Sequence, residues 1–434
     1  MRPASLVLER PVELNFEGNE YRPLLGGDLS SSVPWSEDQR WWVRLPAQNV
    51  LALRTILRKL DYTWALLIFW PLALLSNAQN WGIKSVFALN FLALLTLETR
   101  FISTAEWLWL FSGSTVTNLL TEVLPNIFPL LIGITGILYS EIQLVESFIV
   151  GSLIANLLVG TGLSFVIGGI WNNEQRIDYG GVRNVAVLTL LTAFPYIVPT
   201  FLGAFMRDEL HFDDLRTLIT VEAGVLLAFY IMWLCFRYKT HAFLFQGRGE
   251  LYASPVVDDG LSSSNSGTDL LGEERIQLPS RLWHLLWLII IFAVAVQCSA
   301  NLIHSIPELV KVTPLSQLSI GAVLLPVITS LSNCFKTCLI AKTNRMELVI
   351  HLTVETTLAM VFLNLPGLTF ANMILGHGPL LNLNFILNIS LFISVFTTAY
   401  LIRDGIFHIL KGCMALALYL IIIMGLFVYP NDWD

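Results

Sequence analysis

Residues 141–170 read EIQLVESFIVGSLIANLLVGTGLSFVIGGI, and this one segment already indicates the class of protein. From Ser147 to Ile170 it carries no charged side chain. An α-helix needs about 20 such residues to cross the hydrocarbon core of a bilayer. The segment is therefore predicted to be a membrane-spanning helix, with Ser152 and Asn156 as uncharged polar groups inside it.

The composition extends this interpretation to the whole chain. Hydrophobic residues make up 55% of the 434 residues and charged residues 13%, whereas a soluble domain carries about 25% charged residues. We therefore predict an all-α polytopic membrane protein with about eleven transmembrane helices. The predicted spans lie near residues 61–77, 83–100, 113–138, 141–170, 184–205, 216–237, 281–305, 315–342, 346–367, 381–402 and 405–428.

Polar segments divide the chain into five parts. Residues 1–60 are predicted to be a cytosolic tail with an interfacial segment, and residues 61–240 the first membrane half. Residues 241–280 are acidic and rich in serine, which predicts a flexible cytosolic linker. The second membrane half is residues 281–430, followed by a short non-cytosolic tail, 431–434. One leading helix would then precede two repeats of about five spans, and an odd number per repeat predicts inverted repeats.

Basic residues predict the orientation, because cytosolic loops carry an excess of Lys and Arg. With a cytosolic amino terminus and linker, most basic residues in the loops and at the ends of the predicted spans fall on the cytosolic side. These are Arg100, Arg176, Arg183, Arg237, Lys239, Lys342, Arg345, Arg403 and Lys411. The other side receives Lys84, Arg207, Arg216 and Lys311.

The third and eighth predicted spans each contain a patch of proline or polar residues. They read PNIFPL at 125–130 and TSLSNC at 329–334. Irregular or polar helix segments at membrane depth are tolerated where they line a cavity or are buried in protein. These two patches are therefore candidates for a central site.

Six further stretches, spread over both halves, carry a family resemblance. They are VFALNFLA (86–93), VGSLIANLL (150–158), KTHAFLF (239–245), GAVLLP (321–326), YLIRDG (400–405) and YLII (419–422). From about residue 60 to 430 the chain resembles the calcium/proton exchangers of fungal and plant vacuoles. The resemblance implies two inverted repeats that work by alternating access between the two sides of the membrane.

The motif of that family, Gly-Asn-Ala-x-Glu in each repeat, is altered in this chain. The resemblance keeps Asn126 but puts Pro129 at the first glutamate. In the second copy Ser330 stands at the asparagine and Asn333 at the glutamate. Calcium prefers six to eight oxygen ligands, several of them anionic. We therefore expect millimolar or absent calcium binding. The ion-binding candidates are Asn126, Pro129, Glu146, Ser152, Asn156, Ser330, Asn333, Lys336 and Glu355.

Lys336 lies one turn after Asn333, in the middle of a predicted span. An unpaired ammonium is costly there, so such a residue usually faces a cavity and pairs with an acid. We expect this acid to be Glu355 in the next span, with Glu146 as the second candidate. A buried lysine can act as a tethered cation or carry a proton. The alternative is a snorkelling side chain or a fixed ion pair without a transport role.

Two further pairs of side chains have a spacing of four residues. His351 and Glu355 would share a helix face, and because imidazole titrates near neutral pH they are candidates for a proton relay. The alternative is a histidine that only forms hydrogen bonds near the cytosolic end. Cys334 and Cys338 have a spacing that can bind zinc or copper, but buried inert thiols are the favoured interpretation. No resident metal site is predicted.

Together these features predict a cation/proton antiporter-like transporter in a vacuolar membrane or another endomembrane. It would carry calcium or, with the acidic ligands lost, another cation. The alternative is a transport-inactive relative that regulates or assembles with an active exchanger, as a homo- or hetero-oligomer. The expected partners are the lipid bilayer, an inorganic cation and protons, and not nucleic acid. The sequence has no phosphate-binding loop, nucleophile triad or redox motif, so we expect no enzyme and no cofactor.

Overall fold

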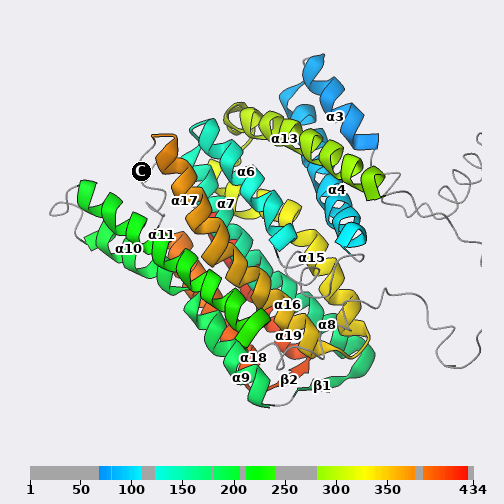
Figure 1. The fold of residues 1–434 in the computed structure, drawn as a ribbon, viewed down its shortest axis with the longest axis vertical. Coiled ribbons are helices and arrows are strands. Elements are labelled where there is room, and N and C mark those ends of the chain that lie inside the picture. The colour runs from blue at the N-terminus through cyan, green and yellow to red at the C-terminus, as the bar shows by residue number, and fades with distance from the viewer. Residues whose placement is uncertain are drawn as a thin grey trace, which may run out of the picture. The chain divides into compact units, whose positions relative to one another are not determined.

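The computed structural model is almost entirely helical, as the sequence predicts (Figure 1). It describes residues 68–79, 81–109, 123–177, 179–205, 212–240, 281–376 and 385–428. These residues belong to one unit, Tyr62–Asp434. The predicted tails 1–60 and 431–434 and the linker 241–280 lie outside the described residues.

Among the described residues of the first half, ten helical segments follow the leading helix α3 (Phe69–Ala78). They are α4 (Ile83–Trp109), η2 (Leu124–Asn126), α6 (Ile127–Leu138), α7 (Ile142–Ile154), η3 (Ala155–Gly160), α8 (Thr161–Asn172), α9 (Tyr179–Leu191), α10 (Phe194–Phe205), α11 (Phe212–Cys235) and η4 (Phe236–Thr240). The second half contains α13 (Arg281–Val312), α14 (Gln317–Ser319), η6 (Ile320–Leu324), α15 (Leu325–Lys342), α16 (Met346–Ala359), η7 (Met360–Asn364), α17 (Leu365–Ile374), α18 (Phe385–Arg403) and α19 (Ile409–Val428).

Each of the eleven predicted spans overlaps a helix of the structure. Among the described residues, eight helices are long and apolar enough to cross a membrane, and Leu124–Leu138 and Val185–Thr200 are shorter apolar segments. The span predicted at 184–205 is not one straight helix, because a turn at Thr192 separates α9 from α10. Pro195 in the first turn of α10 has no amide to continue the preceding hydrogen-bond ladder.

Each half packs against the other through the same set of helices, so that a contact from one half has a counterpart from the other. Helix α4 lies along α13; α6 packs against α17, and α15 packs against α8. In the same way α11 contacts α17, and its counterpart in the second half, α19, contacts α8. Helix α9 contacts α16, and its counterpart α18 contacts α7. Such reciprocal contacts are what two structurally equivalent repeats produce, so the packing agrees with the predicted division into five and five.

Two glycines let the halves approach each other closely. A Cβ atom placed on Gly151 of α7 would lie 2.2 Å from the carbonyl oxygen of Ala322 in η6. A Cβ atom on Gly321 would lie 1.9 Å from Ser147 Oγ. Both distances are far below van der Waals contact, so the backbones of α7 and η6 meet only because these side chains are absent.

Irregular helical turns occur in the third, fourth, eighth and ninth spans, but not always where the motifs predict them. The 3₁₀ turn η2 contains Pro125, and Pro129 lies in the first turn of α6, where no intrahelical amide is required. The second motif, 329–334, is regular α-helix within α15. The irregular part of that span is the preceding π-helical segment η6, and η3 and η7 are π-helical as well.

A short strand pair joins the two halves at one end of the bundle (Figure 1). Strand β1 (Glu174–Arg176) pairs antiparallel with β2 (Ile406–His408), with Gln175 opposite Phe407. The pair connects the end of α8 to the turn between α18 and α19. It thus fixes the loops that follow two membrane helices of different repeats.

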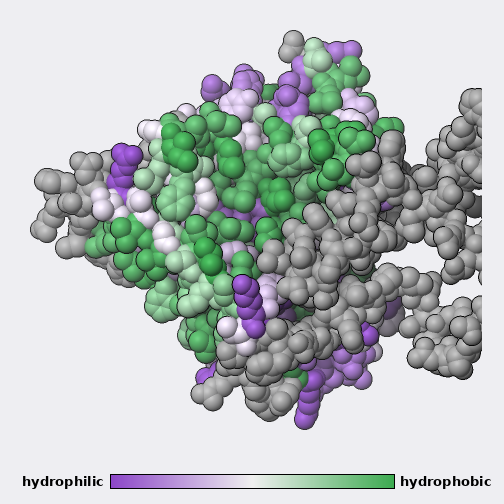
Figure 2. Space-filling view, in the orientation of Figure 1, coloured by the Kyte–Doolittle hydropathy of each residue, from purple (hydrophilic) through white to green (hydrophobic). Residues whose placement is uncertain are grey.

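Hydrophobic side chains cover most of the coloured part of the face shown in Figure 2. Ile231 and Met232 of α11, and Leu420 and Ile421 of α19, are exposed. Large contiguous apolar surfaces are rare on water-soluble monomers. With the long apolar helices, they identify the molecule as an integral membrane protein.

Several basic residues assigned to cytosolic loops lie within helices of the structure, among them Arg100 and Arg237. Arg100 falls within α4, which continues to Trp109, and Arg237 is buried within η4. The helices are longer than the apolar runs that predicted them, because basic side chains inside the bundle can find acidic partners.

Candidate functional site

The asparagine of the first motif meets the ninth span. Asn364 Nδ2, in η7, donates a hydrogen bond of 3.3 Å to Asn126 Oδ1, and both side chains are buried. Asn126 is the last residue of the 3₁₀ turn η2, so the irregular backbone brings its amide to the partner repeat. Asn364 was not among the predicted residues. The only signal in the sequence is a single amide within an apolar run.

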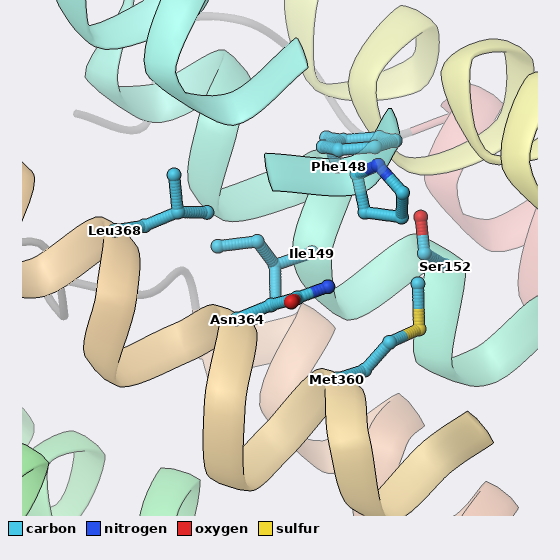
Figure 3. A pocket seen from close by; sticks show the side chains of 7 residues that line it. Phe148, Ile149, Ser152, Met360, Asn364 and Leu368 are labelled. Carbon is cyan, nitrogen blue, oxygen red and sulfur yellow. The ribbon is translucent and has the colours of Figure 1, made fainter. Parts of the chain in front are cut away.

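A small cavity adjoins these helices. It is lined by Pro129, Phe148, Ile149, Ser152, Met360, Asn364 and Leu368. Figure 3 shows Phe148, Ile149 and Ser152 on α7, and Met360, Asn364 and Leu368 on the segment formed by η7 and α17. Its volume of about 10 Å³ is close to the space that the centre of one water molecule needs.

The cavity offers oxygen atoms but no lining carboxylate. Ser152 Oγ and Asn364 Oδ1 are buried, and neither has a hydrogen-bond partner among the described residues. Pro129 contributes its ring and supplies neither charge nor amide. Two unsatisfied buried oxygens usually bind water or another ligand. The chemistry of this cavity therefore suits a water molecule or a weakly held cation.

Asn156 forms the corresponding link on the fourth span. Its Nδ2 donates to Thr357 Oγ1 at 2.8 Å and to the Thr353 carbonyl oxygen at 3.0 Å, 201 and 197 residues away. Asn156 lies in η3 and both threonines in α16. Two of the predicted residues, Asn126 and Asn156, thus bind the ninth span directly and hold the repeats together.

The second motif lies against the fourth span. Helix α15 packs on η3 and α8, and a Cβ atom placed on Gly160 would lie 3.9 Å from Cys334 Sγ. Ser330 is buried, and Asn333 and Lys336 are half-buried. The described residues contain no group of three or more His, Cys, Asp or Glu side chains that is placed to hold a metal ion. Cys334 and Cys338 form no disulfide.

Glu355 forms an ion pair with Arg237, which corrects the prediction that its partner is Lys336. Arg237 Nη1 lies 2.9 Å from Glu355 Oε1, and the side chains are only 8% and 9% exposed. The two residues come from η4 at the end of the first half and from α16 of the second. The sequence did not indicate this pair, because Arg237 stands among residues predicted to be a loop.

The other two charged candidates are also buried. His351 Nε2 lies 4.0 Å from Glu347 Oε1. Glu347 is one helical turn before His351, whereas Glu355 is one turn after it. Glu146 of α7 is 6% exposed, so it is not the solvated boundary residue that its position in the sequence allowed. The proposed His351–Glu355 relay remains a prediction.

Glu98 is a further buried acid, and it is not among the predicted ion-binding residues. It lies in the middle of α4 and is 0% exposed. Lys336 of α15 and Glu98 are electrostatic neighbours. Its place within a long apolar run was the signal that it is buried.

Comparison with known proteins gives matches over most of the chain. Residues 84–239 match the family described as "Sodium/calcium exchanger protein". The vacuolar calcium ion transporter of Schizosaccharomyces pombe is 26% identical over 432 residues, covering 98% of this chain and 97% of that protein. The Ca²⁺/H⁺ antiporter of Aphanothece halophytica is 27% identical over 376 residues, covering 86% and 98%.

Solved structures match the fold. The crystal structure of the Ca²⁺/H⁺ antiporter protein YfkE has a TM-score of 0.68 at 17% identity and covers 85% of this chain and 99% of that one. The crystal structure of the H⁺/Ca²⁺ exchanger CAX has a TM-score of 0.61 at 12% identity, covering 86% and 88%. The chain is thus an integral membrane protein that has the fold of the calcium/proton exchangers.

Proposed function

We propose that the chain is a member of the calcium/proton exchanger family, and that it exchanges a cation for protons across the vacuolar membrane or another endomembrane. The observation that carries the proposal is the similarity along almost the entire length of a vacuolar calcium ion transporter. The packing supports it, because the helices that bear both motifs meet the fourth and ninth spans.

The site favours low affinity for calcium. Hard divalent cations select sites by the number and charge of their oxygen ligands. The oxygens at the cavity belong to a serine and an asparagine, and the buried acid Glu355 is already neutralised by Arg237. We therefore expect calcium to half-saturate transport at about millimolar concentration, or a monovalent cation to be the better substrate.

A transport-inactive regulatory relative is the second candidate. The ion pair between Arg237 and Glu355 favours it, because a fixed guanidinium occupies the carboxylate that an exchanged cation would need. The cavity has space for about one water molecule, and this small size also favours a transport-inactive protein. In this candidate the chain would assemble with an active exchanger.

Proton-coupled flux separates the two candidates. The full chain would be purified and reconstituted in vesicles with an acidic interior that contain a pH-sensitive dye. Calcium, sodium, potassium and manganese would each be added outside. Exchange is expected as alkalinisation of the interior with at least one of them. The absence of exchange with all four would contradict the transport proposal and favour the regulatory one.

Two variants make the flux measurement specific. Asn364→Ala removes the amide that binds Asn126 and borders the cavity, so it should reduce the flux at least about tenfold if cation ligation or helix positioning depends on it. Tyr400→Phe changes a 68%-exposed side chain on α18 and should leave the flux unchanged. Equal loss in both variants would show a general effect on folding.

A further inference from the structure

Glu98 is buried without the contacts that a carboxylate ordinarily requires. The residue is 0% exposed, and neither Oε1 nor Oε2 has a hydrogen-bond partner among the described residues. It lies within the apolar segment Ile83–Ala105, which is long enough to cross a membrane. A buried polar group without a hydrogen bond is unfavourable, and a buried charge without a partner is far more so.

Helix α15 supplies the ionisable groups that face Glu98. Lys336 and Cys334, both on α15, are its electrostatic neighbours. Among the described residues, the other elements that pack closely on α4 are α3, η2 and α13. The first two contain no ionisable residue. Near the level of Glu98, α13 meets α4 through Phe292, whose ring lies 6.2 Å from that of Phe101.

On α4 itself, the nearest charged residue in sequence is Arg100, two positions after Glu98. Arg100 has other interactions in the structure, and neither Glu98 oxygen accepts a hydrogen bond from it. The charge of Lys336, on the opposite half of the molecule, is therefore the cation that the described surroundings offer to Glu98.

This arrangement allows two protonation states, one for each position of Lys336. With the helices packed as described, none of the described residues donates a hydrogen bond to the carboxyl group, so a bound proton removes the cost of burying its charge. If the Lys336 ammonium moves into contact, the ionised carboxylate gains a charge-assisted hydrogen bond and the proton can leave. Because α4 and α15 belong to different repeats, their relative position changes whenever the repeats move against each other.

We propose that Glu98 is an intramembrane proton-binding site, which holds a proton in the described arrangement and releases it when the Lys336 ammonium comes into contact. The ligand is the proton itself, and the site is separate from the cavity lined by Pro129 and Asn364. Coupling of this site to cation movement rests on the proposed function. The binding of the proton does not.

Infrared spectroscopy of the purified full chain tests the site without any transport measurement. A protonated carboxyl group absorbs as a C=O stretch that is lost on ionisation, so a pH titration of this band follows buried acids. Glu98→Gln replaces the acid by a neutral side chain of nearly the same shape, and the spectrum at neutral pH should lose one protonated carboxyl. Tyr400→Phe, on the exposed surface of α18, should leave the carboxyl band unchanged.

Lys336→Met tests the assigned partner and uses the native Glu98, so it does not depend on how well Glu98→Gln folds. Without the ammonium, the Glu98 band should persist to a pH at least about one unit higher, whereas Lys336→Arg should keep the wild-type titration. Identical wild-type and Glu98→Gln spectra at every pH would overturn the proposal. So would a Glu98 band that Lys336→Met does not move. A confirmed band together with absent flux would contradict only the proposed transport function.

Discussion

Arg237 and Glu355 are each about nine-tenths buried, and they neutralise each other at 2.9 Å. A pair of this kind adds little net stability by itself, because both charges lose their hydration. Its effect is on specificity, because either residue alone would lose its oppositely charged partner at 2.9 Å. The pair therefore fixes how the end of α11 and η4 meets α16.

A double-mutant cycle measures this dependence. Arg237→Met alone or Glu355→Gln alone should lower the free energy of unfolding by about 3–5 kcal/mol, because each removes the oppositely charged neighbour of a buried charge. The double variant should lose clearly less than the sum of the two. Thermal unfolding in detergent provides the values, with Tyr400→Phe as the control on an exposed face. Simple additivity of the two losses would contradict the pair.

At this scale the sequence indicated which residues are unusual but not which of them pair. Glu355 and Lys336 stand out as charges within apolar runs, and both lie inside the bundle. The choice of partner depends on how far α11 extends, since η4 carries Arg237 into the bundle. Extension of a helix by a single π-helical turn leaves no pattern in the sequence, because neighbouring helices rather than local propensity stabilise it.

Among the helices and their connections, the turn between α18 and α19 is the most heavily bonded. Lys411 Nζ binds the Asp404 carboxylate and also donates to the carbonyl oxygens of Leu401 (3.0 Å) and Ile406 (2.7 Å). Gly405 in the same turn has a φ of 68°, and its carbonyl oxygen accepts a hydrogen bond from Ile177. The turn thus holds β2 next to β1.

Asp404 makes this turn sensitive to pH. Partial burial alone would raise the pKa of its carboxyl group, but the hydrogen bonds from Lys411 and from the Ile406 amide outweigh burial, and the pKa is lowered. A lowered pKa in the folded state stabilises the fold above the unfolded value of about 3.9, and the contribution is lost as the pH falls through the folded value.

Asp404→Asn should therefore lower stability at neutral pH and cost nothing at strongly acidic pH. The side chain is half exposed, so the loss should not exceed about 1 kcal/mol. Melting temperatures of the variant and the wild type, measured from pH 3 to 8, would show two curves that converge at the acidic end. Glu174→Gln, which removes the exposed pair with Arg176, is the matched control and should have a smaller effect. Parallel curves would count against a role for the Asp404 charge.

Most helices could be predicted from the sequence, since a run such as 141–170 has no charge to interrupt it. The π-helical segments η3, η6 and η7 could not. They lie where helices of the two repeats touch, so their geometry depends on a partner more than 100 residues away, as the 201-residue separation of Asn156 and Thr357 shows. For the same reason the sequence did not show that 329–334 is regular helix and that the irregular turn lies earlier in the span.

In the molecule as a whole, the contact between α7 and η6 sets how closely the repeats approach. Gly151→Ala should disrupt it, because the added Cβ would lie 2.2 Å from the backbone oxygen of Ala322, which has no rotamer to change. A loss of about 1–3 kcal/mol in stability is expected, together with reduced flux. Gly425→Ala is the matched control, since nothing lies within 4 Å of its added Cβ. Similar losses in both variants would show that the close contact is unimportant.

Two equivalent halves were predictable because, apart from the leading helix, five predicted spans lie on each side of the linker 241–280, and an odd number per repeat predicts opposite orientations. The contacts between helices of the two repeats were not predictable from the sequence. Which helix of one repeat meets which helix of the other is decided by side-chain shape at contacts such as Gly151 with Ala322 and Asn126 with Asn364. A hydropathy pattern gives the polarity of side chains and not their shape, so it does not predict these contacts.

The glycine contact has a consequence for the order in which the protein is made. Gly151 and Ser147 are synthesised and inserted into the membrane long before Gly321. Until η6 is made, this part of α7 has no packing partner. Contacts between residues so distant in sequence form late and slowly. During that interval the face of α7 is open to lipid or to assembly factors. Substitutions at Gly321 should therefore appear first as poor biogenesis, with little full-length protein reaching the membrane, and only second as a defect in the finished molecule.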